Sequence, residues 1–163
     1  MQTLTSLALA EKLNYRFAKG GVWFMPFSPA HATRINTDQE EVLVHNADVS
    51  TLLTQQSQMG PAVTGFVALK PVVAFGFVSI WDGVAEAWMI ADNGARERPL
   101  TMTKVGIHVM DIAKISMGLH RLQITVRTTD IRALRWAGAI GFRAESVLHK
   151  YGPDGVDYLM MTR

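Results

Sequence analysis

The sequence predicts a single α+β domain with a central mixed, mostly antiparallel sheet of about six to seven strands, flanked by helices. Residues 62–91 are rich in β-branched and aromatic side chains and are split by Lys70-Pro71 and Asp82-Gly83. An Asp-Gly pair between apolar runs indicates a hairpin, so three antiparallel strands are expected here. Residues 99–118 have helical periodicity, and residues 121–127 alternate between apolar and polar side chains.

Composition limits the classes of protein to consider. The chain has 163 residues, 48% of them apolar and 18% charged, which is typical of one globular domain. The net charge is +2 and there is no polybasic run, so nucleic-acid binding is not expected. Without cysteines there are no disulfides or thiolate zinc sites, and the five histidines lack paired ligand spacing, so no metal is expected. The N-terminal residues lack a basic region followed by an apolar segment, so we expect no signal peptide, no membrane association and a cytoplasmic location.

The first sixty residues are expected to contribute helices and one strand. Residues 3–19 predict a short helix that ends at Gly20-Gly21, and we treat residues 1–20 as an N-terminal helical extension of a domain at 21–163. The aromatic run at 21–27 predicts a strand, and Ser28-Pro29 begins a helical or turn segment. Residues 36–58 predict two helices with Asp48 as the N-cap between them, and Gly60-Pro61 ends this region.

The second half predicts a helix, a strand, a helix and a final hairpin. A polar loop at 92–99 precedes a helix that has Pro99 in its first turn and ends near Gly118. The predicted inner stripe of this helix consists of Met102, Val105, Val109, Ile112 and Ser116. Its predicted solvated face consists of Lys104, His108, Asp111 and Lys114. Residues 121–127 predict a strand, and Thr128, Thr129 or Asp130 predict the cap of the next helix. Gly141 is expected to end that helix with Phe142 folded back on its last turn, before two strands around Gly-Pro-Asp-Gly.

This order of elements resembles the GNAT (acyl-CoA-dependent N-acetyltransferase) superfamily from residue 21 to the C-terminus. The segment after its fifth strand often reads Asn-x-x-(Ala/Ser)…Leu-Gly-Phe, and the matching residues are Asp130, Ala133, Ile140, Gly141 and Phe142. The tail RAESVLHKYGPDGVDYLMMTR is similar to that of the ribosomal-protein N-acetyltransferase branch. The WMIAD segment with the loop after it is similar to small GNAT-like proteins of tailed bacteriophages.

The resemblance implies acetyl-CoA as co-substrate, an amine acceptor that includes proteins among its candidates, and a site along the fourth strand. The implied general base is Glu86. The family is also compatible with a homodimer. The implied cofactor-binding residues are Trp88, Met89, Ile90, Ala91 and Asp130. In place of the family's pyrophosphate loop, we expect Arg96 and Arg98 to bind phosphate and Thr101 to donate from its hydroxyl. The implied acceptor-facing residues are Thr125 and Arg127. The alternatives are structural: Glu86 as an exposed strand residue, Trp88 as core, Arg96 and Arg98 as solvated loop residues, and Asp130 as an N-cap only.

Two departures from the family pattern leave the function open. Many GNAT enzymes carry a tyrosine as general acid where this chain has Ala137, although the ribosomal-protein branch commonly lacks it. The pyrophosphate loop, (Gln/Arg)-x-x-Gly-x-(Gly/Ala) in the family, here has one early glycine, Gly94, and Pro99 removes an N–H. The first hypothesis is an acetyl-CoA-dependent N-acetyltransferase that acts by direct amine attack in a ternary complex, in the host cytoplasm if phage-encoded. The second is a catalytically inactive GNAT-like binding or virion-associated protein.

Overall fold

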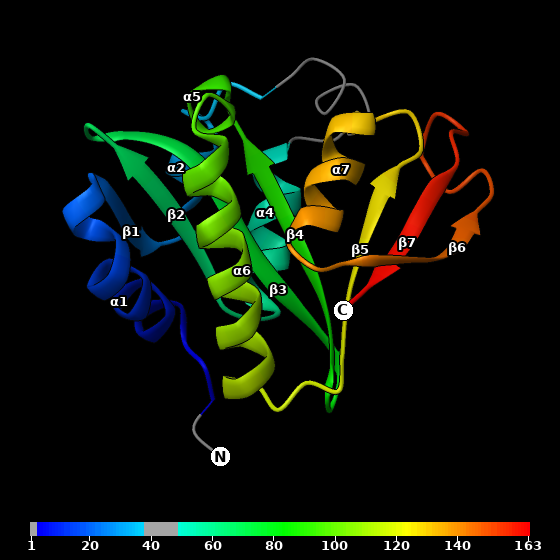
Figure 1. The fold of residues 1–163 in the computed structure, drawn as a ribbon, viewed down its shortest axis with the longest axis horizontal. Coiled ribbons are helices and arrows are strands. Elements are labelled where there is room, and N and C mark those ends of the chain that lie inside the picture. The colour runs from blue at the N-terminus through cyan, green and yellow to red at the C-terminus, as the bar shows by residue number, and fades with distance from the viewer. Residues whose placement is uncertain (1–2, 38–48) are drawn as a thin grey trace.

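The computed structural model describes residues 3–37 and 49–163, which form one seven-stranded sheet with helices on both faces (Figure 1). The strand order is β1-β2-β3-β4-β5-β7-β6, and every neighbouring pair is antiparallel except the parallel pair β4–β5. The predicted α+β class and mixed, mostly antiparallel sheet are therefore confirmed. The predicted cap at Asp48 lies outside the described residues.

The helices and strands have the following bounds. The first half contains α1 (Ser6–Phe17), a short 3-10 helix (Ala18–Gly20), β1 (Val22–Pro26), α2 (Pro29–Ala32), α4 (Val49–Gln58), β2 (Ala62–Val67), β3 (Lys70–Trp81) and β4 (Val84–Ala91). The second half contains α5 (Asn93–Arg96), α6 (Pro99–Ser116), β5 (Arg121–Arg127), α7 (Ile131–Ala139), β6 (Arg143–Leu148) and β7 (Tyr158–Thr162).

The three central strands form the predicted hairpins, but the first turn lies two residues earlier than predicted. Ala68 and Leu69 make the turn with φ angles of 48° and 65°, whereas Lys70 and Pro71 already belong to β3. Pro71 fits there because it is the second residue of the strand and lies opposite Phe66, at the register shift between Gly65 and Phe66 where a ladder N–H is dispensable. The Asp82-Gly83 turn is confirmed, with Gly83 at φ 77°.

Two apolar layers cover the sheet. On one face α1, α6 and α7 enclose the principal core, in which Leu9, Leu13 and Phe77 are fully buried. On the other face α2 and α4 contribute Ala32 and Leu53 to a smaller cluster. The domain boundary at residue 20 stays a prediction, although α1 packs into the same core as the sheet.

The helix α6 buries residues of the predicted inner stripe and two further residues beside it. Val105 and Val109 are buried as predicted, and Met110 and Ala113 join them. His108, predicted to be solvated, is instead half-buried because its ring packs edge-on against Phe17 of α1, with the centroids 5.8 Å apart. Among the described residues no helix combines the length and the hydropathy needed to cross a bilayer.

Both ends of α7 are as predicted. The Asp130 carboxylate accepts a hydrogen bond from the Ala133 N–H at 2.9 Å, which caps the first turn. At the other end Gly141 has φ 100°, and the Phe142 N–H donates to the Ala137 carbonyl at 3.0 Å. The Phe142 side chain is 3% exposed, so the chain reversal buries it beneath the helix.

Gly141→Ala is expected to destabilise the fold by about 1–2 kcal/mol, because an L-residue is strained in the left-handed region. A Cβ there would also lie 2.8 Å from Nε of Arg163. Gly138→Ala is the matched control on the same helix, since a Cβ there meets nothing within 4 Å. It should be neutral or stabilising by up to about 1 kcal/mol. Urea unfolding of both variants measures the difference, and equal stabilities would contradict the assigned cap.

Candidate functional site

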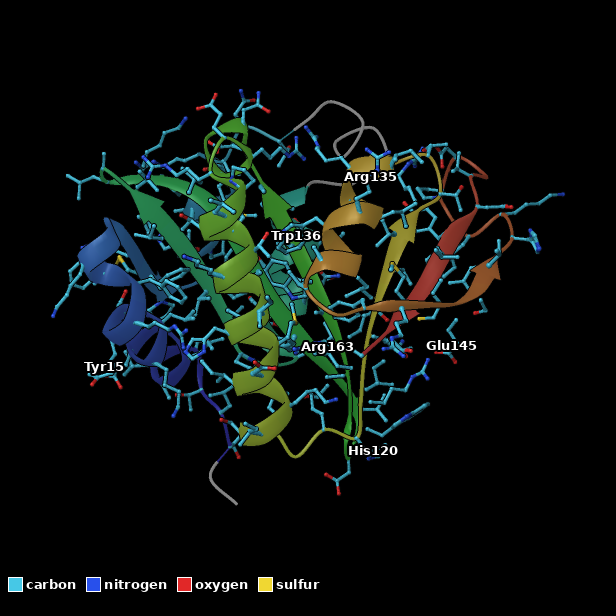
Figure 2. The ribbon with its side chains drawn as sticks, viewed as in Figure 1. Tyr15, His120, Arg135, Trp136, Glu145 and Arg163 are labelled. Atoms are coloured by element: carbon cyan, nitrogen blue, oxygen red, sulfur yellow. The ribbon has the colours of Figure 1, made fainter. Side chains whose placement is uncertain are left out.

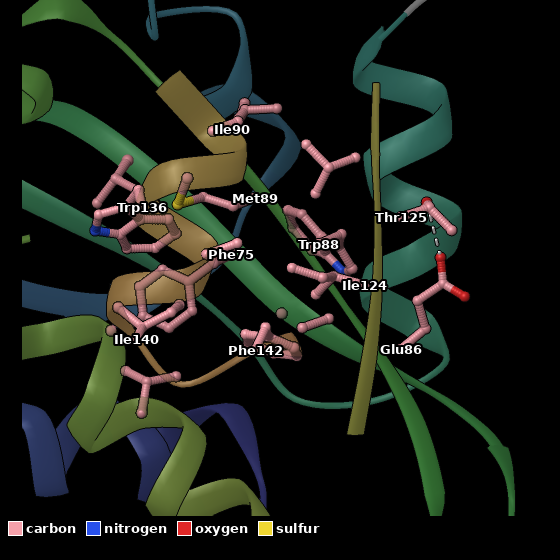
Figure 3. Close-up of a pocket in the computed structure, with 18 of the residues that line it drawn as sticks. Phe75, Glu86, Trp88, Met89, Ile90, Ile124, Thr125, Trp136, Ile140 and Phe142 are labelled. Atoms are coloured by element: carbon pink, nitrogen blue, oxygen red, sulfur yellow. Dashed lines mark hydrogen bonds between the residues drawn. The ribbon is translucent and has the colours of Figure 1, made fainter. Parts of the chain in front are cut away.

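The site lies where β4 and β5 separate. These parallel strands pair only from Val84↔Arg121 to Glu86↔Gln123 and then diverge toward their carboxyl ends (Figure 1). A cavity of about 330 Å³ occupies this opening, bounded by both strands and by α6, α7 and α4 (Figure 3). An opening inside a sheet is unusual, because each separated strand leaves a row of backbone groups unpaired.

The direction of those backbone groups follows from the neighbouring pairs. The Asp92 N–H donates to the Val72 carbonyl of β3, so the backbone groups of Asp92 point toward β3. Successive residues of a strand point their N–H and C=O groups to opposite sides, so those of Met89 and Ala91 point toward β5. The Arg163 N–H likewise pairs with the Leu122 carbonyl, so the alternate residues of β5 turn theirs toward β4. Beyond Gln123 the described residues form no β4–β5 ladder. Two backbone edges therefore face each other across the cavity.

Regular pairing fixes which side chains of β4 share a face. The β3–β4 register is continuous from Val73↔Ala91 to Ser79↔Ala85, so no bulge interrupts this stretch. Glu86, Trp88 and Ile90 therefore lie on one face, as predicted for unbroken alternation, and Ile90 belongs to the cluster beneath α2 and α4.

Glu86 is half-buried at the narrow end of the opening. Its Oε2 accepts a hydrogen bond from Nε2 of Gln123 at 3.0 Å. Its Oε1 accepts one from the Thr125 hydroxyl at 3.4 Å (Figure 3). Both partners lie on β5, on the face predicted to carry its polar side chains. The carboxylate is thus held in one position while it borders the cavity.

Charged and aromatic side chains of β5 and the last hairpin cluster at the carboxyl end of β5. Arg127 pairs with Asp154 at 2.8 Å and lies over the Tyr158 ring, which packs edge-on against Tyr151. The hydrogen bond to Asp154 is the main cause of the raised pKa of Arg127, and the same bond lowers the pKa of Asp154. Partial burial, then the Glu86 carboxylate and Tyr158, raise the pKa of the Tyr151 phenol.

Two tryptophans border the cavity with buried indole nitrogens. Trp88 packs edge-on against Phe27 at 5.7 Å, and Trp136 projects from α7 toward Gly106 of α6 (Figure 2). Neither Nε1 has a hydrogen-bond partner among the described residues. Because buried donors are normally satisfied, these two N–H groups indicate room for water or a bound molecule beside them. Trp88 thus serves both in packing and in the wall of the cavity.

The segment expected to be a polar loop contains one helical turn, α5. The Asp92 carboxylate, which is 1% exposed, accepts from the Ala95 N–H at 3.1 Å and caps this turn, and it lies 3.2 Å from Nζ of Lys70. Arg98 is the exposed N-cap residue of α6, whose first residue is Pro99.

The predicted site residues divide into two groups. Those that line the cavity are Glu86, Trp88, Met89, Ile90, Thr125, Arg127 and Asp130. Those that do not line it are Ala91, Arg96, Arg98 and Thr101, which lie between the end of β4 and the first turn of α6. Further residues line or support the cavity without having been predicted, among them Gln123, Trp136 and Tyr158. Of these, Gln123 was visible as the neighbour of Thr125 on the polar face of β5.

His31 connects α2 to the sheet beneath the Trp88 side of the cavity. Its Nδ1 accepts a hydrogen bond from the Ser28 N–H at 3.2 Å and lies 2.9 Å from the Thr64 hydroxyl. Burial, and secondly Arg34, lower the pKa of His31 below its ordinary 6.5. Protonation at Nδ1 would remove the acceptor that Ser28 uses.

Stability is therefore expected to fall as the pH drops through about 6.5. A histidine with a lowered folded-state pKa binds protons more weakly than the unfolded chain does, so acid favours unfolding. His108 contributes in the same direction, since burial also lowers its pKa. Unfolding free energies at about pH 7.5 and 5.5 measure the slope. His31→Asn should reduce the slope relative to wild type, and an unchanged slope would refute this role of His31.

Comparison with known proteins supports the fold assignment. No protein-family model matches the chain, and no curated protein sequence does. Among solved structures, Ard1 from Thermoplasma volcanium superposes with a TM-score of 0.74 at 16% identity, covering 88% of this chain and 97% of that one. The ribosomal-protein-S18-alanine N-acetyltransferase from Escherichia coli has a TM-score of 0.65 at 16% identity over 86% and 92%. The yncA protein from Salmonella typhimurium, solved with its cofactor acetyl-CoA, superposes with a TM-score of 0.65 at 13% identity, covering 88% of this chain and 93% of that one.

The chain therefore has the fold of the GNAT acetyltransferases. The similar structures include further GNAT-family acetyltransferases, such as one from Bacillus anthracis with a TM-score of 0.70. In the described part of the chain, no three potential ligand side chains gather in a way that would hold a metal ion.

Proposed function

We propose that the protein is an N-acyltransferase that uses acetyl-CoA as donor and an amine as acceptor. The observation that carries the proposal is the opening between β4 and β5, which combines two facing backbone edges with the anchored carboxylate of Glu86. This arrangement provides a slot for an amide-containing chain and a base at its narrow end.

The residues along the opening fit the pantetheine arm of the donor. The backbone groups of Met89 and Ala91 would pair with its amides, and the buried indole N–H of Trp88 offers a further donor. At the wide end Arg96 and Arg98 would bind the phosphates, with the Thr101 hydroxyl in the first turn of α6. Asp130 would border the arm from the start of α7.

Glu86 would act as the general base. Its carboxylate would accept a proton from the acceptor ammonium, and the neutral nitrogen would then attack the thioester carbonyl. The C–N bond forms, the C–S bond breaks, and the thiolate leaves and takes up a proton. Gln123 and Thr125 hold the carboxylate for this step, and Arg127 and Thr125 lie on the side from which the acceptor would approach. The acceptor, with protein amines among the candidates, stays a prediction.

Thermal unfolding with and without acetyl-CoA tests the proposal. A ligand that binds the folded state should stabilise it by about 2.7 kcal/mol at a hundredfold excess over its dissociation constant. ATP at equal concentration controls for non-specific phosphate binding. A melting temperature unchanged at millimolar acetyl-CoA would contradict the proposal.

The alternative is a GNAT-fold binding or virion-associated protein without cofactor. It is favoured by the wide end of the opening, where the capped turn α5 and Pro99 replace the glycine-rich loop of the family. This alternative predicts no thermal response to any acyl-CoA and a stable protein partner. A phage origin, a host-cytoplasmic location and a homodimer stay predictions under both readings.

A further inference from the structure

The side of the opening from which the acceptor would approach carries a negative charge without a cation to balance it. Among the described residues, the Glu86 carboxylate receives its hydrogen bonds from two neutral groups, the Gln123 amide and the Thr125 hydroxyl. Burial, and secondly the charge of Glu86, raise the pKa of the Tyr151 phenol, so this charge acts beyond its own hydrogen bonds. An ammonium group placed beside Glu86 would supply the missing cation.

The arginines at the two ends of β5 are already engaged by carboxylates. Arg121 forms an ion pair with Glu145 at 2.9 Å. Arg127 binds both carboxylate oxygens of Asp154 with its two terminal nitrogens, at 3.2 Å and 2.8 Å. Both arginines alternate with the polar residues that hold Glu86, so they lie on the same face of the strand. Neither guanidinium is therefore an unpaired cation that could receive a second anion.

Two further cations of the last hairpin are solvated. Arg143 and Lys150 are exposed, on the edge strand β6 and in the turn after it. Since β6 lies three strands from β4, Arg143 is about 14 Å from Glu86 at the usual strand spacing. Salt largely screens exposed charges at that range. The acceptor side is therefore suited to a cation, but not to a molecule that brings a carboxylate beside its ammonium group.

We propose that the acceptor is a primary amine with an uncharged substituent on its amino carbon, so that free amino acids are poor substrates. The inference rests on the proposed function and specifies its acceptor. A carboxylate on the amino carbon would lie about 5–6 Å from that of Glu86, and their repulsion should weaken binding about 10–100-fold. An amide in its place carries no charge. The buried Nε–H of Arg127, which has no partner among the described residues, is a donor suited to such a neutral oxygen.

Acetylation of three matched amines, namely phenylalaninamide, phenylethylamine and phenylalanine, tests the inference. Values of kcat/KM, corrected for the fraction of neutral amine, should be about 10–100-fold lower for phenylalanine than for phenylalaninamide, which has nearly the same size but no carboxylate. Equal values for these two overturn the inference. So does the absence of turnover with both carboxylate-free amines in protein that binds acetyl-CoA. If acetyl-CoA does not bind, the proposed function fails first, so the two failures are distinguishable.

A variant that releases Arg127 provides the decisive comparison. Asp154→Asn removes the carboxylate that engages Arg127, so the guanidinium becomes available to the carboxylate of a substrate. The preference for phenylalaninamide over phenylalanine should then fall by about tenfold. Glu11→Gln removes the same charge from an exposed position on α1 and should keep the preference. An undiminished preference in Asp154→Asn, measured on protein that unfolds cooperatively and binds acetyl-CoA, would overturn the inference.

Discussion

Glu86→Gln is expected to lower kcat/KM for N-acetylation by about 10²–10⁴-fold, the usual contribution of a general base. Glutamine has nearly the same shape, and its carbonyl oxygen can still accept the hydrogen bond from Gln123 while its NH2 group donates to the Thr125 hydroxyl oxygen, but it cannot take a proton from an ammonium. Because the donor slot is unchanged, the dissociation constant of acetyl-CoA should stay within about twofold. Steady-state kinetics with a panel of primary amines, combined with donor titration, measures both quantities.

Two further variants separate catalysis from structure at Glu86. Glu11→Gln changes an exposed glutamate on α1, away from the opening, and should leave activity unaltered. Thr125→Val removes one of the two hydrogen bonds that orient the carboxylate, so it should cost activity without abolishing it. Full activity of Glu86→Gln with every accepted amine would refute the role of Glu86 as base.

The double variant Arg96→Ala, Arg98→Ala is expected to weaken acetyl-CoA binding by about 10–100-fold. Each guanidinium would make charge-assisted hydrogen bonds to phosphate at the start of α6, where Pro99 supplies no N–H and the glycine-rich loop is missing. The loss should appear in the dissociation constant and in KM rather than in kcat, since the phosphates are remote from the reacting carbonyl.

The matched control for the arginines is Arg143→Ala, an exposed arginine on β6 at the far edge of the sheet. It changes the net charge in the same direction and should leave the donor affinity within about twofold. S-acetyl-pantetheine, which lacks the pyrophosphate, is the second control, because it should bind wild type and double variant equally. A double variant with undiminished affinity for acetyl-CoA would remove the arginines from the site.

The periodicity of the sequence was sufficient to predict the sheet and α7, but not every turn. Asp82-Gly83 and Gly141 were recognisable because glycine occupies positions with positive φ. Ala68 and Leu69 occupy such positions without glycine or asparagine, so the turn chemistry pointed instead to the following Pro71. The position of such a turn is decided by long-range packing, and contacts between distant residues cannot be recognised in a single sequence.

The site was predictable only where a strand orders the side chains. Glu86 was assigned to the face of Trp88 by alternation, and the regular β3–β4 register agrees with that assignment. Tyr158 and Trp136 enter the cavity from segments that are distant in sequence, so local pattern gave no signal for them. The helical turn α5 was also missed, because it depends on the Asp92 cap rather than on periodicity.

Calorimetric titration with acetyl-CoA and free CoA tests most directly whether the opening between β4 and β5 is a donor site. We expect saturable binding of acetyl-CoA with one site per chain. We also expect competition by free CoA and loss of affinity in the Arg96→Ala, Arg98→Ala variant. No heat of binding at millimolar acetyl-CoA, from protein that unfolds cooperatively, would contradict this expectation and leave the GNAT fold as a scaffold without its donor.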